Sequence, residues 1–111
     1  MTIKEMKANH DYSFECNMSD WYKNYENIDE WGCAFAWYGD IGVEYNFAVE
    51  TYNNEKYTAC AIYKMEFNNE TENMETDYDT FVEYDIDFND VDWIDKLENA
   101  MCEALIKFFD L

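Results

Sequence analysis

Residues 41–67 read IGVEYNFAVETYNNEKYTACAIYKMEF, and this stretch decides the fold. From Ile41 to Val49 apolar side chains occupy every second position, which is the pattern of a strand with one buried face. The polar segment 52–55 contains Asn53 and Asn54, which are turn-forming residues. The alternation then resumes and continues to Phe67. Two alternating runs joined by a short polar segment predict an antiparallel hairpin.

Two further strands are predicted before this hairpin. Residues 12–18 carry an apolar set at every second position, namely Tyr12, Phe14, Cys16 and Met18. Residues 31–37 alternate large side chains with small ones, as Trp31, Cys33, Phe35 and Trp37 against Gly32, Ala34 and Ala36. The segment 38–40 contains Gly39 and is expected to turn the chain into the hairpin. The middle of the chain is therefore predicted to be an antiparallel meander.

Two short helices are expected near the N-terminus. Thr2 and Glu5 have the spacing of a capping box, which predicts a helical turn over residues 3–8. Ser19 is expected to cap a second helix that ends at Gly32. Its apolar residues recur at helical spacing, as Trp21, Tyr25 and Ile28.

The last third of the chain predicts a loop, a strand and a helix. Residues 68–76 are polar and lack periodicity, so they are expected to form a mobile loop that carries Glu70, Glu72 and Glu75. Residues 78–88 alternate, with a predicted core face made of Tyr78, Thr80, Val82, Tyr84, Ile86 and Phe88. Asn89 or Asp90 is expected to cap a C-terminal helix. Its apolar face comprises Val91, Ile94, Leu97, Met101, Ala104, Leu105 and Phe108.

These elements predict one α+β domain spanning residues 1–111. The strands form an antiparallel sheet of about five strands, the C-terminal helix packs on one face, and a short helix lies near the N-terminus. A chain of 111 residues is long enough to bury one core but too short for two stable domains.

The charge of the chain is strongly negative, since 26 Asp and Glu residues face 7 Lys residues and no Arg, a formal net charge of −19. Binding of nucleic acids or anionic membranes needs clustered Lys or Arg, so both are excluded as direct partners. Acidic disordered chains are poor in aromatic residues, whereas 20% of this chain is aromatic, so the chain is expected to fold. No secretion signal and no run of about 18 apolar residues occurs, which favours a soluble intracellular protein.

The inventory of reactive residues argues against an enzyme. The chain has one histidine, His10, which is expected in a turn at the surface, and two serines. Its four cysteines lack paired spacing and are interpreted as reduced, buried thiols. These are Cys16, Cys33, Cys60 and Cys102. Residues 85–92 begin like a calcium-binding loop, but Asp90 replaces the required Gly and Lys96 the required Glu. No metal site and no cofactor are therefore predicted.

The acidic residues are concentrated in one part of the chain. Residues 66–98 hold 13 acids and one Lys, which gives a net charge of −12. Carboxylates at alternate strand positions are about 6.7 Å apart, close to the spacing of phosphates along a nucleic-acid strand. Repulsion among so many carboxylates lowers the stability of the folded chain, so we expect this acidic surface to have a function. The predicted partner-binding residues are Asp77, Asp79, Phe81, Glu83, Asp85, Asp87, Asp90, Asp92 and Asp95, with Glu70, Glu72 and Glu75 from the loop.

In size, charge and the acidic run from Asp77 to Asp95, the chain resembles the small acidic DNA-mimic inhibitors encoded by phages and mobile elements, which include anti-CRISPR and anti-restriction proteins. This resemblance implies a non-catalytic inhibitor in the cytoplasm of an infected bacterial host. Its partner would be a basic nucleic-acid-binding protein such as a CRISPR effector or a restriction nuclease, whose DNA-binding site it would occupy.

Two alternatives stay open. The composition also resembles an immunity protein that neutralises a basic nuclease toxin. A more distant alternative is an acidic enzyme or a calcium-binding module.

Overall fold

The structure is a computed structural model that describes residues 1–17, 31–52, 55–86 and 90–111. It contains two helices and five strands within those ranges. In chain order they are α1 (Ile3–Ala8), β1 (Tyr12–Asn17), β2 (Trp31–Tyr38), β3 (Ile41–Tyr52), β4 (Glu55–Asn68), β5 (Asn73–Glu83) and α2 (Trp93–Phe108). Most of the predicted second helix and the turn at residues 53–54 lie outside the described residues, but Gly32, which was predicted to end that helix, lies in β2 instead.

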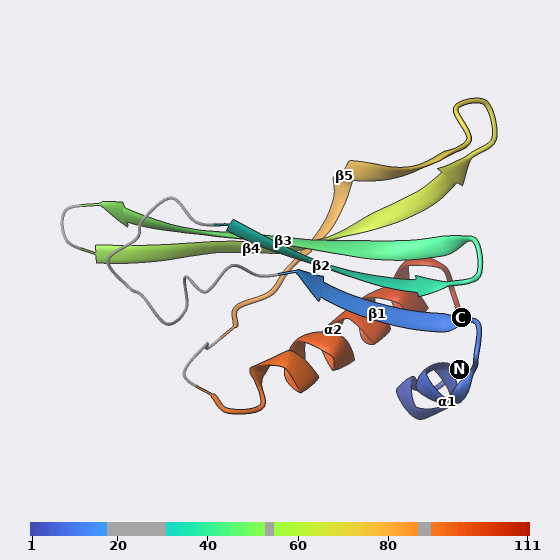
Figure 1. Cartoon of the computed structure of the whole chain (residues 1–111), viewed down its shortest axis with the longest axis horizontal. Helices are drawn as coiled ribbons and strands as arrows, with labels where there is room; N and C mark the ends of the chain where they lie inside the picture. The colour runs from blue at the N-terminus through green and yellow to red at the C-terminus, as the bar shows by residue number, and fades with distance from the viewer. Residues whose placement is uncertain (18–30, 53–54, 87–89) are drawn as a thin grey trace.

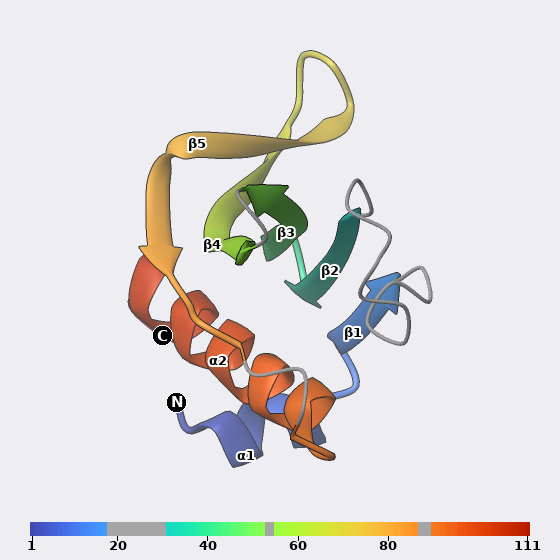
Figure 2. The same cartoon turned by 90° about the vertical axis from the view of Figure 1, so that its left-hand side faces the viewer.

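The five strands form one antiparallel sheet in the order β1-β2-β3-β4-β5. Each strand pairs with its neighbour in sequence, as the meander pattern predicted. Figures 1 and 2 show both helices on the same side of this sheet. The expected α+β fold, with a C-terminal helix on one face and a short N-terminal helix, is therefore confirmed. Neither of the two described helices is long and apolar enough to cross a membrane.

The hydrophobic core lies between α2 and the sheet. From α2, fully buried Leu97, Met101 and Leu105 point into this core. From the sheet, the core receives Ala34, Ala36, Val43, Tyr45 and Ile62. Burial of each large apolar side chain stabilises the fold by about 1.5–3 kcal/mol. The small side chains of β2 face α2, so the helix packs closely on the sheet.

The N-terminal segment is joined to α2 by polar contacts. The capping box is present, since Glu5 N donates to Thr2 Oγ1 at 3.1 Å and the Glu5 side chain accepts from the Thr2 backbone. Lys7 Nζ donates to Asn99 Oδ1 at 2.6 Å. The N-terminal ammonium donates to the carbonyl oxygen of Leu111 at 2.6 Å. The predicted helix over residues 3–8 is therefore confirmed, and it is held against α2.

The loop and strand predicted for residues 68–88 are partly wrong. A short turn at residues 69–72 replaces the long loop, and β5 begins at Asn73 and ends at Glu83. Tyr78 was predicted in the core but is 62% exposed, because the pairing of β4 with β5 shifts between Tyr63 and Lys64. The prediction is confirmed for Tyr84 and Ile86, which pack against the core. Residues 87–89 lie outside the described part.

The start of the C-terminal helix also differs from the prediction. Asp92 is the N-cap residue, and its side chain makes no capping hydrogen bond. Val91 precedes the helix and is fully exposed, and Ile94 is 44% exposed, so neither belongs to the apolar face. Trp93, which is 7% exposed, fills that position in the core instead. The helix is thus rotated relative to the predicted apolar face in its first turn.

Candidate functional site

The most acidic part of the described structure is the end of the β4–β5 hairpin. We call residues 66–83 the acidic arm; it projects from the body of the sheet at the upper right of Figure 1. The arm holds seven acids and no Lys. All seven side chains are exposed: Glu66, Glu70, Glu72, Glu75, Asp77, Asp79 and Glu83. The structure therefore gathers all of the predicted acids from residues 70–83 in one exposed segment.

Most carboxylates of the acidic arm lack a cationic partner. Glu66 lies 3.4 Å from Lys64 Nζ. The other six acids form no ion pair within the described part of the chain. Glu75 and Asp77 accept local hydrogen bonds, from Thr71 Oγ1 at 3.3 Å and from Asp79 N at 3.0 Å. These bonds order the arm without neutralising its charge.

The acidic arm is bent at Asp77–Phe81. Asp77 pairs with Lys64 and Phe81 pairs with Tyr63, so three residues of β5 have no partner on β4. Thr80 Oγ1 donates to the carbonyl oxygen of Asp77 at 3.0 Å, which closes this bulge. Figure 2 shows β5 turning sharply between its two ends. The straight acidic stripe with a regular 6.7 Å spacing, predicted along residues 77–87, is therefore not formed.

The remaining predicted site residues lie elsewhere. Asp85 follows β5 and is exposed, and Asp87 lies outside the described residues. Asp90, Asp92 and Asp95 lie at the start of α2, at the opposite end of the molecule from the acidic arm (Figure 1). The predicted continuation of one acidic face into the helix is thus interrupted.

Two of these helix acids are paired, in contrast to six of the seven acids of the arm. Lys96 Nζ lies 2.8 Å from Asp90 Oδ2 and 3.7 Å from Asp92 Oδ1. The hydrogen bond that Lys96 donates to Asp90, together with the negative charges of Asp90 and Asp92, raises the pKa of Lys96. Asp90 and Asp92 therefore offer less free negative charge to a partner than the arm does.

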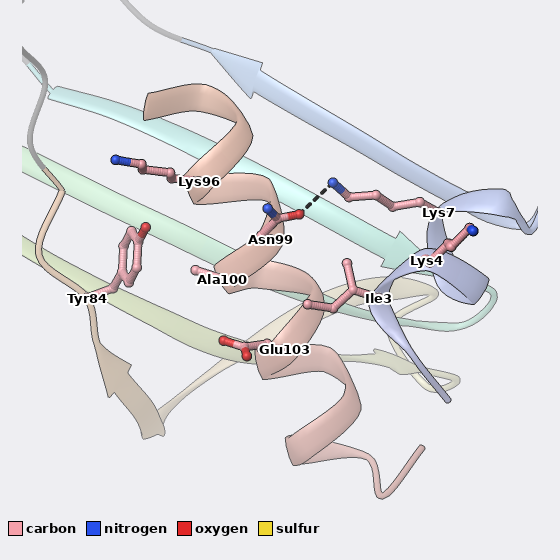
Figure 3. A pocket seen from close by; sticks show the side chains of 8 residues that line it. All are labelled: Ile3, Lys4, Lys7, Tyr84, Lys96, Asn99, Ala100 and Glu103. Carbon is pink, nitrogen blue, oxygen red and sulfur yellow. Dashed lines mark hydrogen bonds between the residues drawn. The ribbon is translucent and has the colours of Figure 1, made fainter. Parts of the chain in front are cut away.

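All five lysines whose side chains the structure describes lie on the helix side of the sheet. Lys4 and Lys7 belong to α1, Lys96 and Lys107 to α2, and Lys64 Nζ lies 5.0 Å from the centre of the Phe109 ring. Three of them, Lys4, Lys7 and Lys96, line a hollow of about 640 Å³ between α1 and α2. Figure 3 shows the side chains around it. Lys7 also lies 3.8 Å from Glu98. The lysine side chains that the structure describes thus lie on the helix side only.

Of the aromatic residues described on the sheet face opposite the helices, the sequence analysis predicted Phe81 as a binding residue but not the others. On this open face Phe35 and Trp37 stack with their ring centres 6.0 Å apart. Tyr63 contacts Tyr78 at 5.0 Å and Phe81 at 6.2 Å between ring centres. The alternation of large and small residues in 31–37 was the available signal. It indicates two unlike faces but not which of them meets a helix.

The described residues show little that favours catalysis. No group of three or more potential metal ligands occurs among them. Burial raises the pKa of the Cys16 thiol to about 11 and also raises the pKa values of Cys33 and Cys102. These thiols are therefore protonated at neutral pH, unlike the activated thiolate of a catalytic cysteine. His10 is exposed in the turn after α1, as predicted.

Comparisons of the chain with protein-family models, with curated proteins and with solved structures found no match. No residue role can therefore be taken from a relative. The charges and shape of the chain's own surface are the basis for assigning a function.

Proposed function

We propose that this protein is a non-catalytic inhibitor of the anti-CRISPR or anti-restriction type. It acts as a DNA mimic that occupies the basic nucleic-acid-binding site of an effector nuclease in the cytoplasm of the bacterial host. One observation carries this proposal: six exposed carboxylates on the projecting acidic arm have no cationic partner among the described residues.

The physical basis is electrostatic complementarity. A site that binds DNA is lined with Lys and Arg, because its affinity comes from neutralising phosphates. The six carboxylates of the arm repel one another in the free protein, and a basic groove would relieve that repulsion. Charge attraction also steers two such surfaces together and accelerates their association. The arm and DNA would then compete for the same Lys and Arg side chains.

The shape of the arm supports insertion into a groove. In its outer part, where Phe67 pairs with Met74 and Asn68 with Asn73, the arm consists of two strands only and extends away from the helix-covered body (Figures 1 and 2). Its exposed aromatic residues are Phe67, Tyr78 and Phe81, which are 44%, 62% and 53% exposed. Aromatic side chains are common anchors in protein interfaces. The arm therefore combines charge for attraction with apolar surface for tight contact.

The experiment is a DNA-binding competition with purified nucleases. A panel of CRISPR effector and restriction nucleases, together with basic nuclease toxins, is incubated with labelled DNA and increasing amounts of the protein. We expect loss of the nuclease–DNA complex near equimolar inhibitor for a defence nuclease. Inhibition of a toxin alone would favour the immunity-protein alternative. If DNA binding by every member of the panel is unaffected, the proposal fails.

Two charge-reversal variants test the role of the acidic arm. The arm variant carries Glu70→Lys, Glu75→Lys and Asp79→Lys. The control carries Asp11→Lys, Asp40→Lys and Glu103→Lys, which are exposed acids outside the arm. Both change the net charge by the same amount. The arm variant should lose inhibition and the control should keep it; equal inhibition by the two would show that the arm does not form the contact.

A further inference from the structure

One row of side chains crosses the open face of the sheet from β1 to β5. Glu15 lies opposite Phe35, Phe35 lies opposite Glu44, Glu44 lies opposite Tyr63, and Tyr63 lies opposite Phe81. We call these five residues the acid–aromatic row. Directly opposed residues in an antiparallel pair have Cβ atoms about 4.5–5.5 Å apart and point to the same face. Each carboxylate of the row therefore has an aromatic ring as its immediate neighbour.

The row is ordered by contacts with its surroundings. Phe35 stacks on Trp37 with an angle of 14° between the two rings. The Trp37 ring covers Gly42 so closely that a Cβ atom there would lie 2.7 Å from its Cε3 atom. Glu44 Oε2 accepts a hydrogen bond from Thr76 Oγ1 at 2.5 Å. Phe35 and Glu44 are therefore held in place before any partner binds.

The row is accessible and uncompensated. Phe81 is 53% exposed, Glu15 is exposed, and the other three members are partly exposed. Both described helices lie on the other side of the sheet (Figure 2). The five lysines whose side chains are described also lie on that other side. An occupant of this face would meet carboxylates and rings and no described cation.

We propose that the acid–aromatic row binds arginine side chains of the partner's basic surface and prefers them to lysine. This inference rests on the proposed function and specifies the chemistry of the partner. An arginine guanidinium is planar, so it can stack on an aromatic face while its N–H groups donate to an adjacent carboxylate in a forked geometry. A lysine ammonium is a hydrated point charge and gains less from a ring beside a carboxylate. The aromatic rings of the row can contact the flat face of a guanidinium, and the neighbouring carboxylates can accept hydrogen bonds from its N–H groups.

A second copy of this chain is a less suitable occupant. It would bring the negative charges of Glu15, Glu44 and Glu83 against those of another face with the same sign, in a protein whose net charge is already −19. Like charges brought together across an interface oppose association. Charge complementarity therefore selects a basic partner.

The test compares labelled nona-arginine and nona-lysine peptides, which carry equal charge. Binding to the full chain is measured by fluorescence anisotropy near physiological ionic strength. We expect nona-arginine to bind about tenfold more tightly, because a guanidinium can stack on a ring while it donates in a fork to the adjacent carboxylate, and more than one ring is available. Equal affinities for the two peptides would overturn the inference.

Matched variants locate the preference. Phe35→Leu combined with Phe81→Leu keeps apolar volume but removes two rings of the row, and should bring the ratio of the two affinities close to one. Phe109→Leu removes a partly exposed aromatic residue on the helix side, outside both the row and the acidic arm, and should leave the ratio unchanged. Thermal unfolding confirms that each variant folds. A ratio that survives the double substitution would overturn the inference.

The same measurements separate this inference from the proposed function. The arm variant should weaken both peptides to a similar degree and preserve their ratio. A clear arginine preference without inhibition of any nuclease would refute the proposed function and leave the arginine site. Nuclease inhibition without an arginine preference would refute the arginine site and leave the inhibitor.

Discussion

The acidic arm and the helix side of the molecule are both rich in carboxylates, but they differ in how those carboxylates are balanced. On the helix side, Lys96 lies near Asp90 and Asp92, and Lys7 lies near Glu98. On the arm, only Glu66 has a lysine within ion-pair distance among the described residues. The helix side also contains the core, whereas the arm carries exposed aromatic residues. The comparison indicates that the helix side stabilises the fold, whereas the arm provides the proposed binding surface.

The largest expected difference between the two regions is in stability. Leu97→Ala in α2 removes a fully buried side chain and should lower the free energy of unfolding by about 2–5 kcal/mol. Tyr78→Ala on the arm should cost under about 1 kcal/mol, because that side chain is 62% exposed. Urea unfolding of both variants checks this contrast. Similar losses would mean that the arm belongs to the cooperative core.

A smaller loss is expected at the contact between β2 and β3 on the open face. In Gly42→Ala the new Cβ atom would meet Trp37 Cε3 at 2.7 Å and the Ala36 carbonyl oxygen at 3.0 Å. Relief of this overlap must move the indole or the backbone, which should cost about 1–3 kcal/mol. Urea unfolding measures the cost, and nona-arginine binding reports whether Phe35 moves with Trp37. Unchanged stability would contradict the close packing.

Alkaline pH should weaken the core side through Cys16. Its pKa is raised from 9.0 to about 11 by burial, so the folded state retains a proton that the unfolded state releases. Stability from this group is present below pH 9 and is lost between about pH 9 and 11, where the unfolded state binds fewer protons. Unfolding midpoints of the protein and of Cys16→Ala across this range provide the test. The variant should show a shallower decline, and parallel declines would contradict the assignment.

The smallest effects concern the balance of surface charge. The combination Glu70→Gln, Glu75→Gln and Asp79→Asn removes unpaired charge from the arm and should raise the melting temperature at low salt. Lys96→Gln leaves Asp90 and Asp92 unpaired and should lower it. Added salt shortens the Debye length from about 30 Å at 0.01 M to about 8 Å at 0.15 M, so both differences should shrink. If the melting temperature shifts in the same direction in both variants, the charges of the two regions do not differ in balance as described.

Most of the fold was predictable because its signals are local. The capping box of Thr2 and Glu5 depends on residues three positions apart, and it forms as predicted. The alternation in residues 41–67 depends on neighbours two positions apart, and both strands form. The candidate site was predicted less well. Its acids were identified by composition, but the bulge in β5 depends on the pairing of Tyr63 and Lys64 with residues about 13–18 positions away.

The two faces of β2 show the same limit. Residues 31–37 predict one face of large side chains and one of small side chains, and either could meet a helix. In the structure Ala34 and Ala36 face α2, while Phe35 and Trp37 lie on the open face. Which face of β2 packs on α2 depends on how closely the helix can approach the sheet. No local sequence pattern predicts that distance.

The sequence by itself determined the net charge, the absence of arginine, the order of the strands and helices, and the concentration of acids after residue 66. These properties follow from composition and from side-chain periodicity over a few residues. Only the tertiary structure decided which acids are paired, where β5 bends and which aromatic residues align with Glu15 and Glu44 across the sheet. Those features arise where strands and helices distant in sequence meet, so their free energies depend on long-range packing.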